Sequence, residues 1–165
     1  MTDNVEQRFL DEILACKGIL HKISRSYCRD SDDRDDLYQE IVANAWNSFA
    51  RFEGRSKFST WLYRVALNTA LSHVRKNRFR KNQTDLEHAE IVAAIDGDGE
   101  SVRLLYQAID HLTPGEKSLA ILYLDDLPYR EIAVITGMTE TNVGVRIHRI
   151  KEKLKEWFNR NGHTN

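Results

Sequence analysis

The sequence predicts an all-α fold made of two small helical domains joined by a flexible acidic linker. Apolar residues recur at helical spacing along most of the chain, and capping residues precede several of these segments. A stretch containing Asp-Gly-Asp-Gly, where helical periodicity is weak, separates the two helical groups. We therefore expect a first domain at residues 1–82, a linker at 83–100 and a second domain at 101–165.

The composition is typical of a globular protein. The chain has 165 residues, of which 41% are hydrophobic and 30% charged. No apolar run approaches the roughly 20 residues of a membrane span, and the first residues lack the order of a secretion signal. We expect a cytoplasmic protein without a cofactor or a metal. Cys16 and Cys28 show no metal-binding spacing with each other or with a histidine, so we expect reduced thiols, with a disulfide as the alternative.

Charge is strongly segregated although the formal net charge is only −1. Residues 30–40 hold six acids and one Arg, and residues 51–81 hold nine Lys or Arg and one acid. Residues 85–100 hold six acids and no Lys or Arg, and residues 146–160 hold six cations and two acids. Two basic blocks separated by acidic ones favour two contact regions on one long polyanion.

The first domain is expected to contain three helices. The first spans about residues 4–29, with Gly18 as a weak point. The acidic turn at residues 30–36 can cap the second helix, at about 34–50. The residues of that second helix expected to face the core are Leu37, Ile41, Ala45, Trp46 and Phe49. A short loop around Gly54 leads to the third helix, at about 58–81.

The third helix carries two different faces. Phe58, Leu62, Val65, Ala66 and Thr69 recur on one side at helical spacing, and Arg64, Asn68, Ser72 and Arg75 on another. Trp61 lies between these faces. Cations that hold a backbone beside a ring that stacks on a base suit single-stranded nucleic acid.

Trp61 has a second interpretation, because a tryptophan at helical spacing is more often part of the core. The stretch alone slightly favours that interpretation. The excess of cations at residues 51–81 shifts the balance, since folding does not require such segregation whereas a polyanionic partner does.

The second domain is expected to end in a helix-turn-helix. Thr113 and Glu116 form a capping box with Pro114 in the first turn. Pro128 begins a short helix containing Ala133, Gly137 makes the turn, and Thr139 caps a final helix reaching about residue 159. Its apolar stripe consists of Val143, Ile147, Ile150, Leu154, Trp157 and Phe158.

The final helix would enter the major groove by its N-terminal half. The polar face carries Thr141, Val145, His148 and Arg149, flanked by Gly144 and Arg146, and Lys151, Lys153 and Lys155 follow for phosphate contacts. Gly144 costs about 1 kcal/mol relative to Ala inside a helix. Close approach of the backbone to DNA would explain it, and simple tolerance is the alternative. Val145 can contact a thymine methyl group, although single exposed apolar residues are common.

The two domains together resemble bacterial sigma factors of the extracytoplasmic-function type. The resemblance covers nearly the whole chain and rests on four motifs. These are Asp36-Leu-Tyr-Gln-Glu40, Ala45-Trp46, the segment from Phe52 to Asn68, and Val143-Gly-Val-Arg-Ile-His-Arg-Ile-Lys-Glu-Lys-Leu154. In this order and spacing they form a highly specific combination.

The resemblance implies a role for each motif. Asp36, Leu37, Gln39 and Glu40 match the segment that docks on the clamp coiled coil of core RNA polymerase. The segment that in this family opens the minus-ten element, and that holds a flipped non-template base, matches residues of the Gly54 loop and the third helix. These residues are Arg55, Ser56, Lys57, Phe58, Trp61, Arg64 and Asn68, and Arg75 lies on the same face. The final helix matches the reader of the minus-thirty-five element. The implied partners are core RNA polymerase, promoter DNA and an anti-sigma factor.

The function implied is binding and not catalysis. Extruding a base costs a few kcal/mol, and aromatic stacking returns about 1–3 kcal/mol per base, so a pocket can trap an opened position without ATP. One alternative is a helix-turn-helix repressor or activator that uses only the second domain. Another is a metal-dependent enzyme built on the carboxylates of residues 30–36, but no His, Gly-rich phosphate loop or activated nucleophile accompanies them, so a solvated helix cap is the expected role of these residues.

Overall fold

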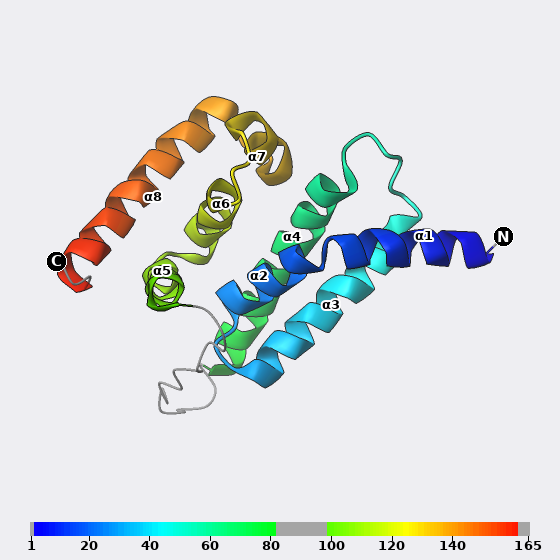
Figure 1. Cartoon of the computed structure of the whole chain (residues 1–165), viewed down its shortest axis with the longest axis horizontal. Coiled ribbons are helices and arrows are strands. Elements are labelled where there is room, and N and C mark those ends of the chain that lie inside the picture. The colour runs from blue at the N-terminus through cyan, green and yellow to red at the C-terminus, as the bar shows by residue number, and fades with distance from the viewer. Residues whose placement is uncertain (1, 82–98, 162–165) are drawn as a thin grey trace. The chain divides into compact units, whose positions relative to one another are not determined.

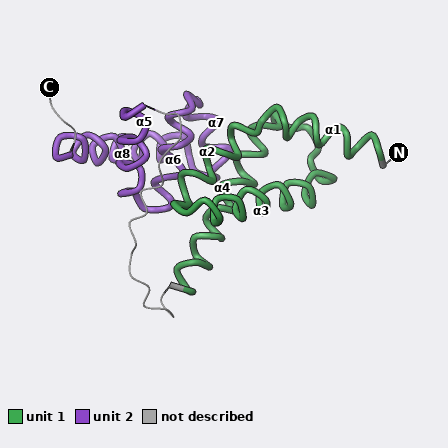
Figure 2. Tube along the Cα trace, turned by 60° about the horizontal axis from the view of Figure 1, so that its bottom comes forward, with its two compact units in different colours: residues 1–92 green, residues 93–165 purple. Residues whose placement is uncertain are grey.

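The described part of the chain is helical and divides into two compact units. The computed structural model describes residues 2–81 and 99–161, and within these ranges it contains helices, turns and loops but no strand. Unit 1 comprises residues 1–92 and unit 2 residues 93–165 (Figure 2). The all-α prediction is therefore confirmed. The linker predicted at 83–100 lies outside the described residues except for Gly99 and Glu100, and the predicted boundaries at 82 and 101 stay predictions.

Within residues 2–81, unit 1 contains four helices, one more than predicted (Figure 1). They are α1 (Thr2–Ala15), α2 (Lys17–Tyr27), α3 (Ser31–Phe49) and α4 (Phe58–Lys81). The first predicted helix is divided at Cys16, and Gly18 lies in the first turn of α2. The amide of Cys16 donates to the oxygen of Ile13, three residues back, so the last turn of α1 tightens and the chain changes direction.

The acidic turn begins α3 as the capping argument predicts. Asp30 has extended backbone angles, and its side chain accepts a hydrogen bond from the amide of Asp33. Asp32 and Asp33 lie in the first turn, where negative charge is favourable. With this cap, α3 starts at Ser31, three residues earlier than expected.

The core of unit 1 forms where α4 packs against α2 and α3. Buried residues come from all three helices: Leu20 and Ile23 from α2, Leu37, Ile41, Ala45 and Phe49 from α3, and Phe58, Leu62, Tyr63, Ala66, Leu67 and Ala70 from α4. Trp46 was predicted to face the core but is 43% exposed. Its ring centroid lies 5.1 Å from that of Phe9 in α1, so α1 covers one side of the tryptophan and leaves the rest exposed.

Unit 2 also contains four helices among its described residues. They are α5 (Glu100–Asp110), α6 (Pro114–Leu124), α7 (Tyr129–Thr136) and α8 (Glu140–Asn161). The capping box of Thr113 and Glu116 is present, with both reciprocal hydrogen bonds and Pro114 at the start of α6. Helix α8 packs against α5, α6 and α7.

The helix-turn-helix consists of α7, a turn and α8. Gly137 ends α7 in the left-handed conformation, with φ of 74°, which glycine adopts at little cost. Thr139 caps α8, because its hydroxyl accepts a hydrogen bond from the amide of Asn142 at 3.1 Å. Val143, Ile147 and Ile150 of α8 are buried, so the predicted apolar stripe is confirmed in its N-terminal half.

Candidate nucleic-acid interface

The polar face of α4 lies on the surface of unit 1. Arg64, Asn68 and Arg75 are exposed, and Ser72 is half-buried. Leu62 and Ala66, which are buried, point away from this face into the core. The division predicted for α4 is therefore present, and a row of cationic and amide groups is available to an external polyanion.

Trp61 lies at the edge of this face and is half-buried. Its ring centroid lies 5.1 Å from that of Phe52, 5.3 Å from that of Phe58 and 6.2 Å from that of Phe49. Trp61 therefore packs against the core and is also partly exposed, so the structure is compatible with both the core interpretation and the base-stacking interpretation.

Phe58 and the preceding loop take different places around Trp61. Phe58 is buried and makes edge contacts with Phe49 and Phe52. It therefore packs beneath Trp61 as part of the core and is not exposed to a ligand. Arg55 is highly exposed and pairs with Glu53 at 2.7 Å. Ser56 donates to the backbone oxygen of Lys57, and Lys57 is exposed at the start of α4.

The residues expected to dock on polymerase do not all face outward from α3. Asp36 and Gln39 are exposed, and Glu40 is half-buried. Leu37 is fully buried, on the same face as Ile41, so it holds the helix in place and does not reach the surface. Glu40 lies 3.2 Å from Nδ1 of His73 and 3.8 Å from Nζ of Lys76.

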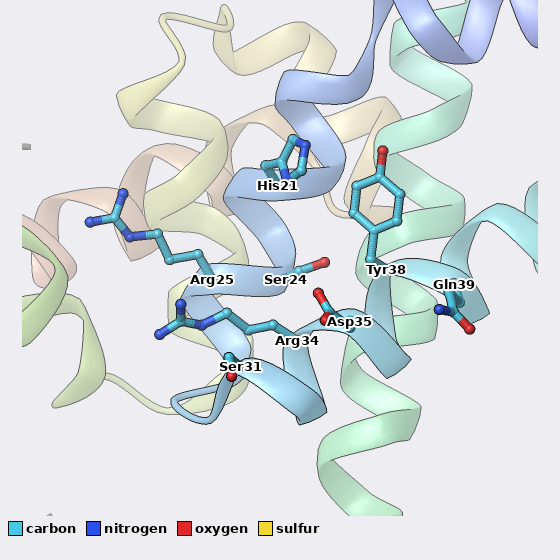
Figure 3. Close-up of a pocket in the computed structure, with 8 residues that line it drawn as sticks. All are labelled: His21, Ser24, Arg25, Ser31, Arg34, Asp35, Tyr38 and Gln39. Atoms are coloured by element: carbon cyan, nitrogen blue, oxygen red, sulfur yellow. The ribbon is translucent and has the colours of Figure 1, made fainter. Parts of the chain in front are cut away.

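An open pocket of about 510 Å³ lies between α2 and α3, beside these exposed residues (Figure 3). The rings of His21 and Tyr38 lie 4.9 Å apart at its wall. Arg34 spans towards the end of α2, where its guanidinium donates to the backbone oxygens of Cys28 and Arg29. The full lining is His21, Ser24, Arg25, Ser31, Arg34, Asp35, Tyr38 and Gln39. Gln39 therefore belongs both to the predicted docking set and to the rim of a hollow.

The expected DNA-reading surface of unit 2 is the outer side of α8. The residues exposed there are Thr141, Val145, Arg146, His148, Arg149, Lys151, Lys153 and Lys155. Two of these lysines already have partners within unit 2. Lys153 pairs with Glu116 of α6, and Nζ of Lys151 lies 4.6 Å from the ring centre of Tyr123. A hydrogen bond with Tyr123 raises the pKa of Lys151.

Gly144 is half-buried on the side of α8 that faces α7. A Cβ atom at this position would meet Cε2 of Tyr129 at 3.5 Å and Cδ2 at 3.7 Å, which are ordinary van der Waals distances. Packing therefore does not require glycine here, and the missing Cβ points towards Tyr129.

Comparison with known proteins finds a separate family match in each unit. Residues 13–80 match the family model described as Sigma-70 region 2, and residues 103–154 match Sigma-70, region 4. The sigma factor HrpL of Pseudomonas syringae pv. syringae is 30% identical over 162 residues, covering 92% of this chain and 85% of that protein. The chain belongs to the sigma-70 family of RNA polymerase sigma factors.

Other relatives refine the type and the fold. The ECF sigma-E factor of Escherichia coli K12 is 30% identical over 152 residues, covering 81% of this chain and 79% of that protein, so this sigma factor is of the extracytoplasmic-function type. A solved structure of the sigma factor RpoE with the anti-sigma factor NepR, from Bartonella quintana, has a TM-score of 0.77. It is 23% identical and covers 94% of this chain and 99% of that one, which shows a shared fold.

Family membership gives the broad role of this sigma factor. It acts with RNA polymerase in promoter-directed transcription initiation, and its family and fold are those of DNA-binding regulators and not of catalysts. In the described part of the chain, no helix has both the length and the apolarity needed to span a bilayer.

Sequence reasoning missed a polar network inside unit 1. His73 of α4 lies with Nε2 2.9 Å from Oδ1 of Asp33 and with Nδ1 3.2 Å from Oε2 of Glu40. Burial raises the pKa of the Asp33 carboxyl, but hydrogen bonds from His73, Cys28 and Asn77 and the charge of His73 outweigh burial and lower it. His73 is 40 residues from Asp33 and 33 from Glu40 in the sequence, so the expectation that no histidine accompanies the acidic turn is wrong, and only the Asp cap of α3 gave a signal.

Proposed function

We propose that this sigma factor binds core RNA polymerase, recognises a minus-ten element with unit 1 and a minus-thirty-five element with unit 2, and traps melted non-template DNA on α4. The observation that carries the proposal is the partly open ring of Trp61 beside the exposed face of Arg64, Asn68 and Arg75. Cations beside an aromatic ring provide the two interactions that single-stranded DNA offers, phosphate pairing and base stacking.

The surroundings of Trp61 support a stacking role. Contacts with Phe52 and Phe58 hold the ring, so little side-chain freedom remains to be lost when a base stacks on it. Stacking contributes about 1–3 kcal/mol per base, comparable with the few kcal/mol needed to extrude one. The loop residues Arg55, Ser56 and Lys57 lie next to this ring in sequence and would hold the adjoining backbone.

The proposed polymerase-docking surface is the exposed side of α3. The side chains of Asp36 and Gln39 are exposed, and that of Glu40 is half-buried. Leu37 is buried in the core and would support the surface by anchoring α3. We also propose an anti-sigma factor as a partner, because the structurally similar sigma factor RpoE forms a complex with one. Such an inhibitor would cover surfaces that polymerase needs.

The proposed minus-thirty-five reader is the N-terminal half of α8. Thr141, Val145, His148 and Arg149 are exposed there, and Arg146 is exposed on their flank. Lys155 is exposed further along α8, whereas Lys151 and Lys153 would have to leave Tyr123 and Glu116 to meet phosphate. We therefore expect phosphate contacts to depend more on Arg146 and Arg149 than on these two lysines.

A pair of tryptophan variants tests the proposal. Promoters are first located by mapping transcript ends after overproduction, and holoenzyme is then reconstituted with each full-length variant. We expect Trp61→Ala to reduce permanganate-reactive thymines at the minus-ten element by roughly fivefold to 150-fold, from a loss of about 1–3 kcal/mol of stacking. Trp46→Ala, at the partly exposed tryptophan of α3, should leave opening unchanged.

Controls separate binding from folding. Circular dichroism should show both variants folded, and native gels should show both bound to core polymerase. Equal opening by wild type and Trp61→Ala would contradict the stacking role. Failure of the wild type to bind core enzyme would contradict the proposal as a whole.

A further inference from the structure

Three potential metal ligands converge in unit 1, two from helices and one from the residue after a helix. Cys28 directly follows α2, Asp33 lies in the first turn of α3, and His73 lies in α4. Their sulfur, carboxylate oxygen and ring nitrogen atoms all lie within 4.8 Å of one another. Cys28 is 2% exposed, and the side chains of His73 and Asp33 are 11% and 34% exposed. The cluster is therefore enclosed, with its open side at the carboxylate.

The chemistry of the three groups matches a borderline divalent ion. Thiolate, imidazole and carboxylate are the side-chain ligands of protein-bound zinc, at about 2.3, 2.0 and 2.0 Å from the metal. A tetrahedron of these lengths places ligand atoms roughly 3.3–3.6 Å apart. The pair Nε2 of His73 and Oδ1 of Asp33, now 2.9 Å apart, would open slightly while the thiol moves inward.

The outer contacts of His73 are those of a metal-binding histidine. A carboxylate on one ring nitrogen commonly fixes the tautomer and directs the lone pair of the other nitrogen at the metal. Glu40 occupies that position, with Oε2 3.2 Å from Nδ1 of His73. Nδ2 of Asn77 lies 3.1 Å from Nε2 and 3.4 Å from both oxygens of Asp33, so this amide is the group an ion would displace.

A hydrogen-bond network would explain the contacts among His73, Asp33, Glu40 and Asn77, and the Cys28 thiol takes part in it through a hydrogen bond with Asp33. A thiol is a weak donor, whereas its thiolate is among the strongest zinc ligands. Six acids between residues 30 and 40 also make the surroundings attractive to a cation. We propose that Cys28, Asp33 and His73 bind one Zn²⁺ or a similar divalent transition ion, with the fourth position open to water.

Such an ion would join the end of α2, the start of α3 and the middle of α4. Since Glu40 holds the outer nitrogen of His73, the ion would also fix the orientation of this α3 side chain. The site needs neither promoter DNA nor polymerase, so it is independent of the function proposed above and can be tested on the free chain.

Cobalt titration of the full-length, reduced and chelator-treated chain tests the site. We expect one Co²⁺ per chain with a thiolate-to-cobalt absorption band that Zn²⁺ abolishes. Cys28→Ser should remove the band and weaken binding at least tenfold, whereas Cys16→Ser, at the other cysteine, should change neither. Glu40→Gln keeps all three ligands and should weaken binding roughly 10–100-fold, as loss of an outer carboxylate does.

Thermal unfolding of the unmodified chain guards against misfolded variants. Saturating Zn²⁺ should raise the Tm of wild type and Cys16→Ser but not that of Cys28→Ser. The proposal is overturned if wild type shows neither a cobalt–thiolate band nor a Tm shift. It is equally overturned if Cys28→Ser, folded by circular dichroism, binds as tightly as wild type.

Discussion

Helices α4 and α8 have nearly the same length, 24 and 22 residues, but are used in opposite ways. Helix α4 packs against both α2 and α3 and is buried on more than one side. Helix α8 buries only Val143, Ile147 and Ile150 and exposes most of its remaining surface. The proposed interface of unit 1 is therefore part of a core helix, whereas that of unit 2 is the free side of a surface helix.

Buried polar groups show what this difference means for α4. Thr69 is buried, donates to the backbone oxygen of Val65 at 2.7 Å and accepts from Nδ2 of Asn44 at 3.0 Å. His73 has carboxylates on both ring nitrogens. Because buried polar groups are costly to leave unpaired, α4 has fewer positions that can change without loss of folding. The exposed face of α4 is therefore held in place by packing and by hydrogen bonds on the buried side of the same helix.

The largest expected effect is therefore a cavity beneath the face of α4. Leu62→Ala, at a fully buried position, should lower the free energy of unfolding by about 2–5 kcal/mol. Urea unfolding of the full chain measures this change. Arg64→Ala, on the exposed face of the same helix, should change stability by less than about 0.5 kcal/mol. Equal losses at both positions would contradict the division of α4 into two faces.

Arg149→Ala is expected to act on DNA binding and not on folding. Arg149 is exposed on the proposed reading side of α8. Its removal should either lower the salt slope of binding by about one or relax one base position by roughly 1–3 kcal/mol. Fluorescence anisotropy with duplexes carrying the upstream element, at several salt concentrations, distinguishes these results. Arg103→Ala, on α5 of the same unit, should leave the slope unchanged, and an unchanged slope and specificity in Arg149→Ala would exclude the contact.

The Asp33 carboxylate makes the stability of unit 1 depend on acid pH. Its pKa in the folded chain is lowered, because hydrogen bonds and the charge of His73 outweigh burial. Its contribution is thus present above the ordinary carboxyl pKa of about 3.9 and is lost as pH falls through the lower folded value. Asp33→Asn should lose about 1–2 kcal/mol near pH 6, a figure reduced for the partial exposure of this side chain.

Unfolding at a series of pH values measures this effect. The difference between wild type and Asp33→Asn should shrink as pH falls below about 4. Asp36→Asn, at an exposed carboxylate of the same helix, is the matched control and should show a much smaller difference. If the difference in unfolding free energy between wild type and Asp33→Asn stays constant with pH, Asp33 contributes through its shape and not through its charge.

The same contrast explains what could be predicted from sequence. Capping by Asp30, Thr113 and Thr139 depends on neighbours three residues away, so local patterns were enough. The N-terminal half of the apolar stripe of α8 was predicted correctly, because α8 packs against the other helices of its unit with a single face. Leu37 was assigned to the core by periodicity and to a partner by resemblance, and periodicity agrees with its burial.

What sequence could not supply depends on contacts between distant segments. Asp33 and His73 lie 40 positions apart and meet only when α3 packs on α4. The exposure of Trp46 depends on how far α1 covers α3, and apolar spacing within one helix carries no information on this. A helix buried on several sides, such as α4, also blurs the periodicity by which faces are assigned.

The smallest effect concerns Gly144, the least expected residue of α8. Gly144→Ala should stabilise unit 2 by about 1 kcal/mol, because alanine favours the helix and its methyl group would meet Tyr129 at an ordinary distance. Since that methyl group would point to α7 and not outward, affinity for the upstream element should stay within about twofold, well below the 1–3 kcal/mol of a lost base contact. Urea unfolding and anisotropy on the same preparation measure both. A stabilised variant with tenfold weaker DNA binding would mean that the backbone at Gly144 approaches DNA too closely for any side chain, and α8 would then be constrained on its outer surface as α4 is in its core.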